Sequence, residues 1–137
     1  MGQPGYGEPV QGSLALRGDQ PPDDAVVVIR GGVLSPQSVQ RAATRSLRLF
    51  GVLGISVEGA IGVSVLEACR TSERLGRYAH VQLSSFGRLR SGGFALLATF
   101  ESPHFTVVLP ELSDLTLARL LRCFDPPVPN PSRRGGG

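Results

Sequence analysis

The stretch 92-GGFALLATFESPHFTVVLP-110 decides the fold of this chain. It holds two apolar runs, Phe94 to Phe100 and Phe105 to Leu109, which are rich in β-branched and aromatic residues and are separated by a short polar segment. This pattern predicts an antiparallel hairpin with a four-residue connection, and we expect the hairpin to form the centre of a sheet. Both runs are nearly continuous rather than alternating. We therefore expect both faces of the hairpin to be covered, or one face to be covered and the other to meet a partner.

Strand and helix patterns alternate before the hairpin, and one more helix pattern follows it. Strands are predicted at Val26 to Ile29, Val52 to Val57 and Tyr78 to Ser84, with a turn at Glu58 to Gly62 and one polar face on the last of these strands. Helices are predicted from Ser35 to Phe50, from about Val65 to Leu75, and from Ser113 or Asp114 to about Cys123. The sequence therefore predicts an α+β fold, with a mostly antiparallel sheet of about five strands and about three helices in the order β-α-β-α-β-β-β-α.

The first predicted helix has clear start and stop signals. Ser35 is a good N-cap, Pro36 fits the first helical position, and Gly51 can end the helix. Apolar residues recur at helical spacing and predict its inward face: Val39, Ala42, Ala43, Leu47 and Phe50.

The 137 residues are enough for one domain, which we place at residues 25–124. Glycine and proline crowd toward the ends, so residues 1–24 are predicted to be a flexible N-terminal arm and residues 125–137 a Pro/Gly/Arg-rich tail. The chain has no run of 18 apolar residues and no secretory leader pattern, so we expect no membrane segment and a cytoplasmic location. Cys69 and Cys123 occupy apolar positions of predicted helices, which favours buried free thiols.

All 14 basic residues are arginines, and the formal net charge is +3. Arg41, Arg45 and Arg48 recur on one helix face with no acid in the same helix, which indicates a partner that offsets their repulsion. Arginine binds phosphate and carboxylate groups in a planar fork, so RNA or DNA and an acidic protein are the candidate partners, with a merely solvated face as the alternative. The segment before the hairpin adds Arg88 and Arg90 as further nucleic-acid-binding candidates.

Two other patterns suggest chemistry. Gly31 and Gly32 join a strand to a capped helix, and exposed amides there can bind an anion, although the spacing fits neither a dinucleotide fingerprint nor a P-loop. His104, together with Arg30 and Tyr78, has the residue types of a metal-independent ribonuclease, with a surface turn histidine as the alternative. The two histidines and two separated cysteines lack metal-ligand spacing, so we expect no metal and no cofactor.

The segments VVVIRGG, FGVLGISV and LRSGGFALLATFESPHFTVVLP, with a terminal PNP, resemble a family of small uncharacterised bacterial proteins. The resemblance covers Val26 to Pro131, and the matching residues are Arg30, Gly31, Gly32, Gly92, Phe94, His104 and Phe105. The small size resembles that of the toxin components of toxin-antitoxin pairs. A weaker likeness to ADP-ribosyltransferases rests on Arg30 and on Ile55 to Val57, but the glutamate motif of those enzymes is not recognisable.

These patterns predict a small cytoplasmic protein that binds or cleaves RNA as a toxin component. The alternative is a non-enzymatic interaction module that docks a partner through its sheet face or its arginine-rich helix. The partner is then RNA or an acidic, antitoxin-like protein, and a homodimer stays open as a further alternative.

Overall fold

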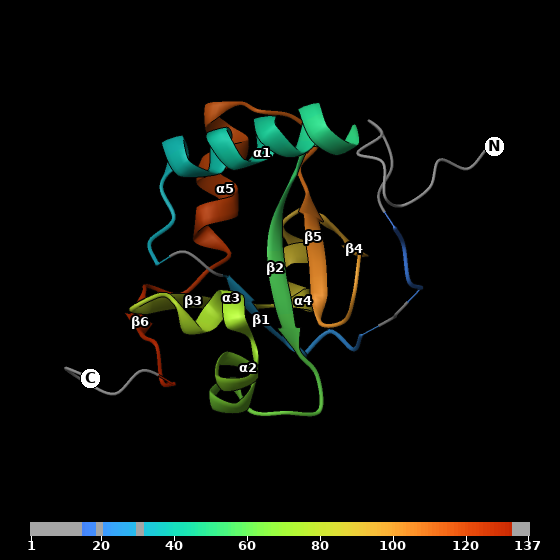
Figure 1. Ribbon diagram of the computed structural model, residues 1–137. Coiled ribbons are helices and arrows are strands. Elements are labelled where there is room, and N and C mark those ends of the chain that lie inside the picture. The colour runs from blue at the N-terminus through green and yellow to red at the C-terminus, as the bar shows by residue number, and fades with distance from the viewer. Residues whose placement is uncertain (1–14, 19–20, 30–31, 133–137) are drawn as a thin grey trace.

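The computed structural model describes residues 15–18, 21–29 and 32–132 of the chain (Figure 1). Six antiparallel strands form one sheet in the order β4-β5-β2-β1-β3-β6. The strands are β1 (Val26–Ile29), β2 (Gly54–Ala60), β3 (His80–Ser85), β4 (Ala95–Ala98), β5 (His104–Val108) and β6 (Val128–Pro129). The helices are α1 (Pro36–Phe50), α2 (Val65–Thr71), α3 (Glu73–Gly76), α4 (Phe86–Ser91) and α5 (Asp114–Arg122). The predicted α+β class and antiparallel sheet are confirmed, and the described residues add short elements at α3, α4 and β6.

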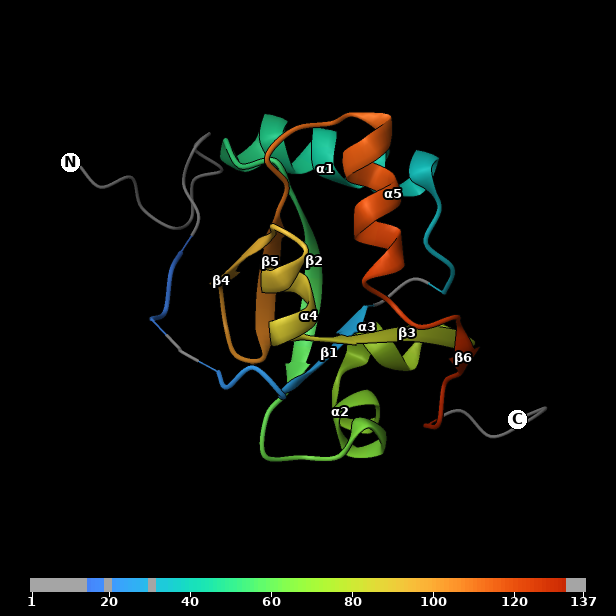
Figure 2. The same ribbon diagram turned by 180° about the vertical axis from the view of Figure 1, so that it is seen from behind.

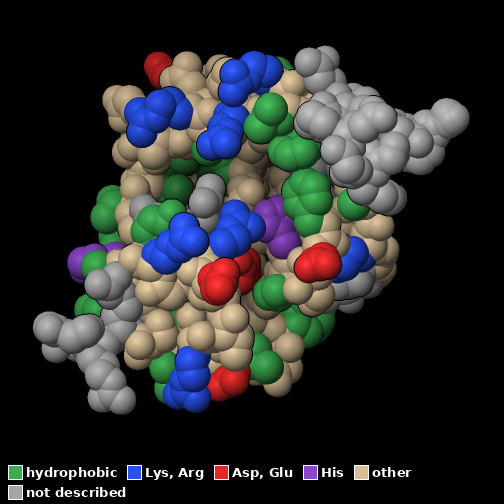
Figure 3. Space-filling model, in the orientation of Figure 1, with side chains coloured by type: hydrophobic (Ala, Val, Ile, Leu, Met, Phe, Trp, Pro, Cys, Tyr) green, Lys and Arg blue, Asp and Glu red, His purple; other side chains and the backbone are tan. Residues whose placement is uncertain are grey.

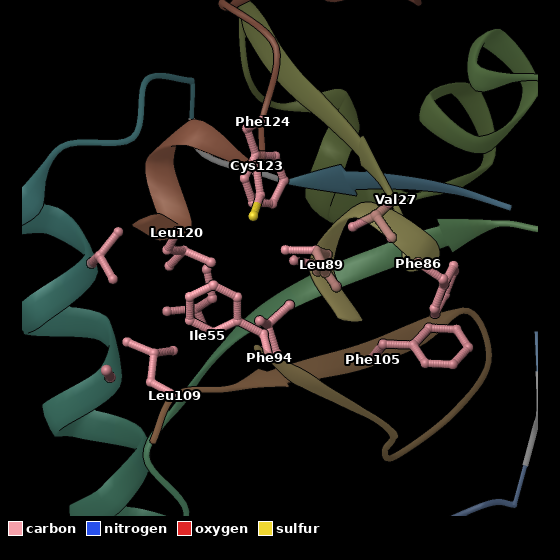
Figure 4. Packing of buried hydrophobic residues seen from close by; sticks show 14 of the residues in the cluster. Val27, Ile55, Phe86, Leu89, Phe94, Phe105, Leu109, Leu120, Cys123 and Phe124 are labelled. Atoms are coloured by element: carbon pink, nitrogen blue, oxygen red, sulfur yellow. The ribbon is translucent and has the colours of Figure 1, made fainter. Parts of the chain in front are cut away.

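The helices cover the two faces of the sheet unequally. In Figure 1, α2 and α3 lie in front of the sheet at its β1 and β3 side, and α1 crosses one end of the strands. In Figure 2, α4 and α5 lie over the opposite face. The main hydrophobic core fills the space between that opposite face and α1, α4 and α5 (Figure 4). A smaller core lies under α2 and α3.

The strand register assigns side chains to the two faces. Val57 pairs with Phe105, and Ile55 pairs with Val107, across β2 and β5. Residues directly opposite each other in an antiparallel pair share a face, and these four are buried in the main core. The alternate residues of β2 and β5, among them Glu58 and His104, therefore face the other way.

The hairpin is present, but the prediction that it forms the centre of the sheet is wrong. β4 is the outermost strand on its side, because β5 pairs with β4 on one edge and with β2 on the other. Adjacency in sequence predicts that β4 and β5 pair, whereas the choice of β2 as the next strand depends on contacts across about fifty residues of chain.

Local signals set the ends of α1 as predicted. The Ser35 hydroxyl accepts a hydrogen bond from the Ser38 amide at 3.0 Å, Pro36 begins the helix, and Gly51 ends it with a left-handed φ of 76°. The inward face is narrower than predicted: Val39 and Ala43 are buried, whereas Ala42 is exposed and Leu47 is 48% exposed. The helix crosses the end of the sheet, so only a thin stripe of its surface contacts the core.

The predicted polar face of β3 is in fact buried at Gln82 and Ser84. The Gln82 side chain accepts a hydrogen bond from the Leu34 amide at 2.6 Å and donates one to the Asp125 carbonyl at 2.9 Å. The Ser84 hydroxyl donates to the Cys123 carbonyl at 2.6 Å. These polar side chains are buried because they satisfy backbone groups of the two loops that pack against β3.

Part of the expected N-terminal arm lies against the hairpin. The Phe100 amide donates to the Ala15 carbonyl at 2.7 Å, and the Arg17 amide donates to the Ala98 carbonyl at 2.9 Å. The Arg17 guanidinium also donates to the carbonyls of Thr99 and His104, both at 2.7 Å. Residues 15–18 therefore extend the edge of the sheet beside β4, while residues 1–14 of the predicted arm lie outside the described part of the chain.

The expected C-terminal tail is likewise docked over its first residues. Val128 pairs with Val81, and the buried Asn130 side chain donates to the carbonyls of Leu75 and Tyr78 at 2.7 Å and 2.8 Å. Both cysteines are buried free thiols, as predicted. Within the described ranges, no helix is long and apolar enough to cross a membrane.

Candidate nucleic-acid interface

The three arginines of α1 lie together on its exposed surface. Arg41, Arg45 and Arg48 are all exposed, and none forms an ion pair with another residue in the described part of the chain. A helix rises about 1.5 Å per residue, so the stripe extends for about 10 Å along the axis. Figure 3 shows basic side chains gathered along α1 on the face that Figure 1 also presents. This surface is a positively charged ridge.

A hollow of about 340 Å³ lies beside this ridge, between α1 and strands β2 and β5. Ser56 and Thr106 form part of its floor, and Phe50 and Phe100 form part of its wall. Arg45 belongs to both the ridge and the hollow, and no carboxylate lines the hollow. The surface dips on the strand side of α1 (Figure 3). The hollow therefore combines apolar walls, hydroxyl groups and one positive charge.

His104 lies next to this hollow. It is the first residue of β5 and only 7% exposed, so the alternative of a surface turn histidine is wrong. Its Nδ1 atom lies 2.8 Å from the Thr99 hydroxyl, which in turn lies 2.9 Å from the hydroxyl of Thr106 on the floor of the hollow. The Phe100 ring meets the imidazole edge-on, with centroids 5.2 Å apart. These contacts fix the ring of His104 and connect it to the hollow.

Glu58 is a further candidate residue, at a position where the sequence predicts a turn. β2 continues through Glu58 to Ala60, and Glu58 is the Cα partner of His104 across β2 and β5. Its side chain is 5% exposed, its Oε2 atom accepts a hydrogen bond from the Ser72 hydroxyl at 3.0 Å, and its Oε1 atom has no hydrogen-bond partner among the described residues. Burial, and then the nearby Glu58 carboxylate, raise the pKa of the Cys69 thiol.

A buried acid and a buried histidine thus sit in register on one face of the sheet, with Cα atoms about 5 Å apart by the geometry of antiparallel pairs. The sequence signal that could have identified this site is an acidic residue directly after an alternating strand pattern. The turn signal from Gly59 and Gly62 obscured it.

The other two predicted catalytic residues do not join His104 in the described structure. Tyr78 precedes β3, and both β2 and β1 lie between β5 and β3 in the sheet. Adjacent strands are about 4.8 Å apart, so the two residues are separated by more than the reach of one hydrogen bond. Arg30 lies outside the described residues.

The predicted anion site between β1 and α1 has fewer available amides than expected. The Leu34 amide donates to Gln82, and the Ser35 and Ser38 amides donate to each other's hydroxyl groups. Gly32 has a left-handed φ of 78°, as a glycine turn requires, and Gly31 lies outside the described residues. Three backbone amides that follow the Gly31-Gly32 turn are therefore already used inside the protein.

Arg88 and Arg90 do not extend the ridge on α1. Both belong to α4, which covers the opposite face of the sheet (Figure 2). Arg88 pairs with Asp125 at 2.9 Å, and Arg90 pairs with Asp23. The five predicted nucleic-acid contacts therefore fall into two groups: three arginines on α1 without an ion pair among the described residues, and two ion-paired arginines on α4.

Comparisons with protein-family models, with curated proteins and with solved structures gave no match. The resemblance to the small bacterial family therefore stays a prediction. Among the described residues, no three His, Cys, Asp or Glu side chains lie close enough to hold a metal ion.

Proposed function

We propose that the protein binds single-stranded RNA through the ridge on α1. The observation that carries this proposal is the exposure of Arg41, Arg45 and Arg48 without an acidic partner among the described residues. Three like charges on one helix face repel each other, and bound phosphates offset that repulsion. Each arginine can donate two parallel hydrogen bonds to a phosphate.

A salt titration tests the proposal. For single strands, each neutralised phosphate contributes about 0.7 to the slope of log affinity against log salt, so three contacts contribute about 2. We expect the Arg41→Gln, Arg45→Gln, Arg48→Gln triple variant to bind a labelled octaribonucleotide more weakly, with a slope shallower by about 2. Fluorescence anisotropy at several salt concentrations measures both quantities.

A charge-matched control separates local contact from net charge. It removes three exposed arginines from other elements: Arg70 on α2, Arg88 on α4 and Arg122 on α5. We expect this control to keep most of the wild-type salt slope. If both triple variants lose the same slope, or if the wild type binds no RNA at low salt, RNA binding by α1 is wrong and docking of an acidic protein on this helix becomes the better proposal.

RNA cleavage is the second candidate, and the register pairing of Glu58 with His104 favours it. In a metal-independent cleavage, the 2′-hydroxyl loses its proton to a base, the bond from O2′ to phosphorus forms, and the bond from phosphorus to O5′ breaks as an acid protonates the leaving oxygen. We propose that His104 transfers protons and that Glu58 positions and stabilises the charged imidazole. Such an activity would suit the toxin component of a toxin-antitoxin pair.

Cleavage is tested by incubating the wild type with RNA in the presence of a chelator. We expect products with a cyclic phosphate, and we expect His104→Gln to abolish them while RNA binding is kept. Glu58→Gln should lower the rate and shift its pH profile. If the wild type leaves RNA intact between pH 5 and 9, the second candidate fails and the first is unaffected.

A further inference from the structure

We infer that the hollow between α1, β2 and β5 is a nucleobase site, which takes one unstacked base of the RNA strand whose phosphates lie on the α1 ridge. This inference rests on the proposed RNA binding and names the part of the ligand that enters the hollow. The evidence for the base site is the shape and lining of the hollow, whereas the evidence for RNA binding is the exposed charge of the α1 ridge.

The size of the hollow fits one ring system. Small-molecule sites have volumes of about 300 to 1,000 Å³, and a hollow of about 340 Å³ is at the lower end of that range. Single-stranded RNA can present one base away from its neighbours, whereas the bases of a duplex are stacked and paired.

The wall of the hollow offers an aromatic surface that is held in place. Phe100 is 38% exposed, and its ring meets Phe50 and His104 edge-on, at centroid distances of 5.3 Å and 5.2 Å. Its φ of 54° is a left-handed conformation that few residues other than glycine adopt. Strained conformations of this kind concentrate at ligand-binding sites. An exposed aromatic ring fixed by two neighbours is a stacking surface for a base.

The floor of the hollow offers polar groups for the edge of a base. Ser56 is half-buried and its hydroxyl makes no hydrogen bond to another described residue, and the Thr106 hydroxyl is held by Thr99 at 2.9 Å. A hydroxyl group can donate or accept, so this floor can bind different bases without strong selection. Arg45 lies at the border of the hollow, where a phosphate of the same nucleotide can bind.

The test compares an octaribonucleotide with a tetrahydrofuran abasic strand that has the same number of phosphates. We expect the wild type to bind the RNA about tenfold more tightly than the abasic strand at equal salt, because stacking of one base on an aromatic ring gives an effect of this order. Phe100→Leu removes the ring, and Ala42→Phe fills the hollow from an exposed position on α1. Both should lose most of the preference for RNA and keep the salt slope.

Ala118→Phe on α5 is the matched control, because Ala118 is also exposed but does not line the hollow. It should keep the wild-type preference. If the wild type binds RNA and the abasic strand equally, or if Ala42→Phe leaves the preference unchanged, the base site is refuted while RNA binding on α1 stands. If neither strand binds at low salt, the proposed function fails, and the base site fails with it.

Discussion

Asn130→Ala should destabilise the protein, although Asn130 lies in a segment that looks like a disordered tail. Its side chain is 2% exposed, and its Nδ2 atom donates to the carbonyls of Leu75 and Tyr78 at 2.7 Å and 2.8 Å. Its Oδ1 atom accepts from the amide and the hydroxyl of Ser132, both at 2.9 Å. Without Asn130, the Leu75 carbonyl still accepts from the backbone amides of Arg77 and Tyr78, but the part-buried Tyr78 carbonyl loses its Asn130 donor.

The expected cost follows from these contacts. Each hydrogen bond contributes about 1 kcal/mol net, and a buried acceptor left without a donor costs about 1 to 3 kcal/mol. We therefore expect the free energy of unfolding to fall by about 2 to 3 kcal/mol, which lowers the Tm of a domain of this size by roughly 10 °C or more. Urea unfolding followed by circular dichroism measures the change.

Pro131→Ala is the control, since Pro131 is exposed and should change the stability by less than about 0.5 kcal/mol. Asn130→Asp should be at least as costly as Asn130→Ala, because an oxygen would then face two carbonyl oxygens. An Asn130→Ala variant as stable as the wild type would show that the C-terminal segment does not anchor the loop before β3.

Three further predictions concern the hairpin, the floor of the hollow and the thiols. Arg17→Gln removes two hydrogen bonds to hairpin carbonyls and a guanidinium stacked 4.8 Å from an aromatic ring, so it should cost about 1 to 3 kcal/mol in urea unfolding. Gly54→Ala should cost about 1 to 3 kcal/mol, measured in the same way, because its Cβ would lie 2.7 Å from a β5 carbonyl oxygen. Burial raises the pKa of both Cys69 and Cys123, so the folded protein should react with thiol reagents at pH 8 far more slowly than the unfolded chain. The pKa of each thiol is higher in the folded protein than in the unfolded chain, so the protonated thiols stabilise the fold fully below the unfolded pKa. This stabilisation is lost as the pH rises through the folded pKa, and urea unfolding curves between pH 7 and 10 should show the loss.

The sequence by itself determined the features that depend on neighbours along the chain. The caps of α1 at Ser35 and Gly51 follow from backbone amides and a left-handed turn within a few residues. The pairing of β4 with β5 follows from a short connection between two apolar runs. The α1 stripe of Arg41, Arg45 and Arg48 follows from helical spacing alone. These interactions form locally, so composition and periodicity are enough to predict them.

Only the tertiary structure decided which distant segments meet. Glu58 and His104 are 46 positions apart in sequence and become neighbours only because β5 pairs with β2 in one particular register. Asn130 becomes buried because the chain after α5 returns along β3, and the proline content of that segment predicts neither this path nor its partners. The hollow beside α1 exists because this helix crosses the end of β2 and β5, and because the residues of these strands that form its floor are small. Hydrogen bonds and packing between distant segments leave no periodic pattern in the local sequence. These features of the candidate site therefore could not be predicted from the sequence.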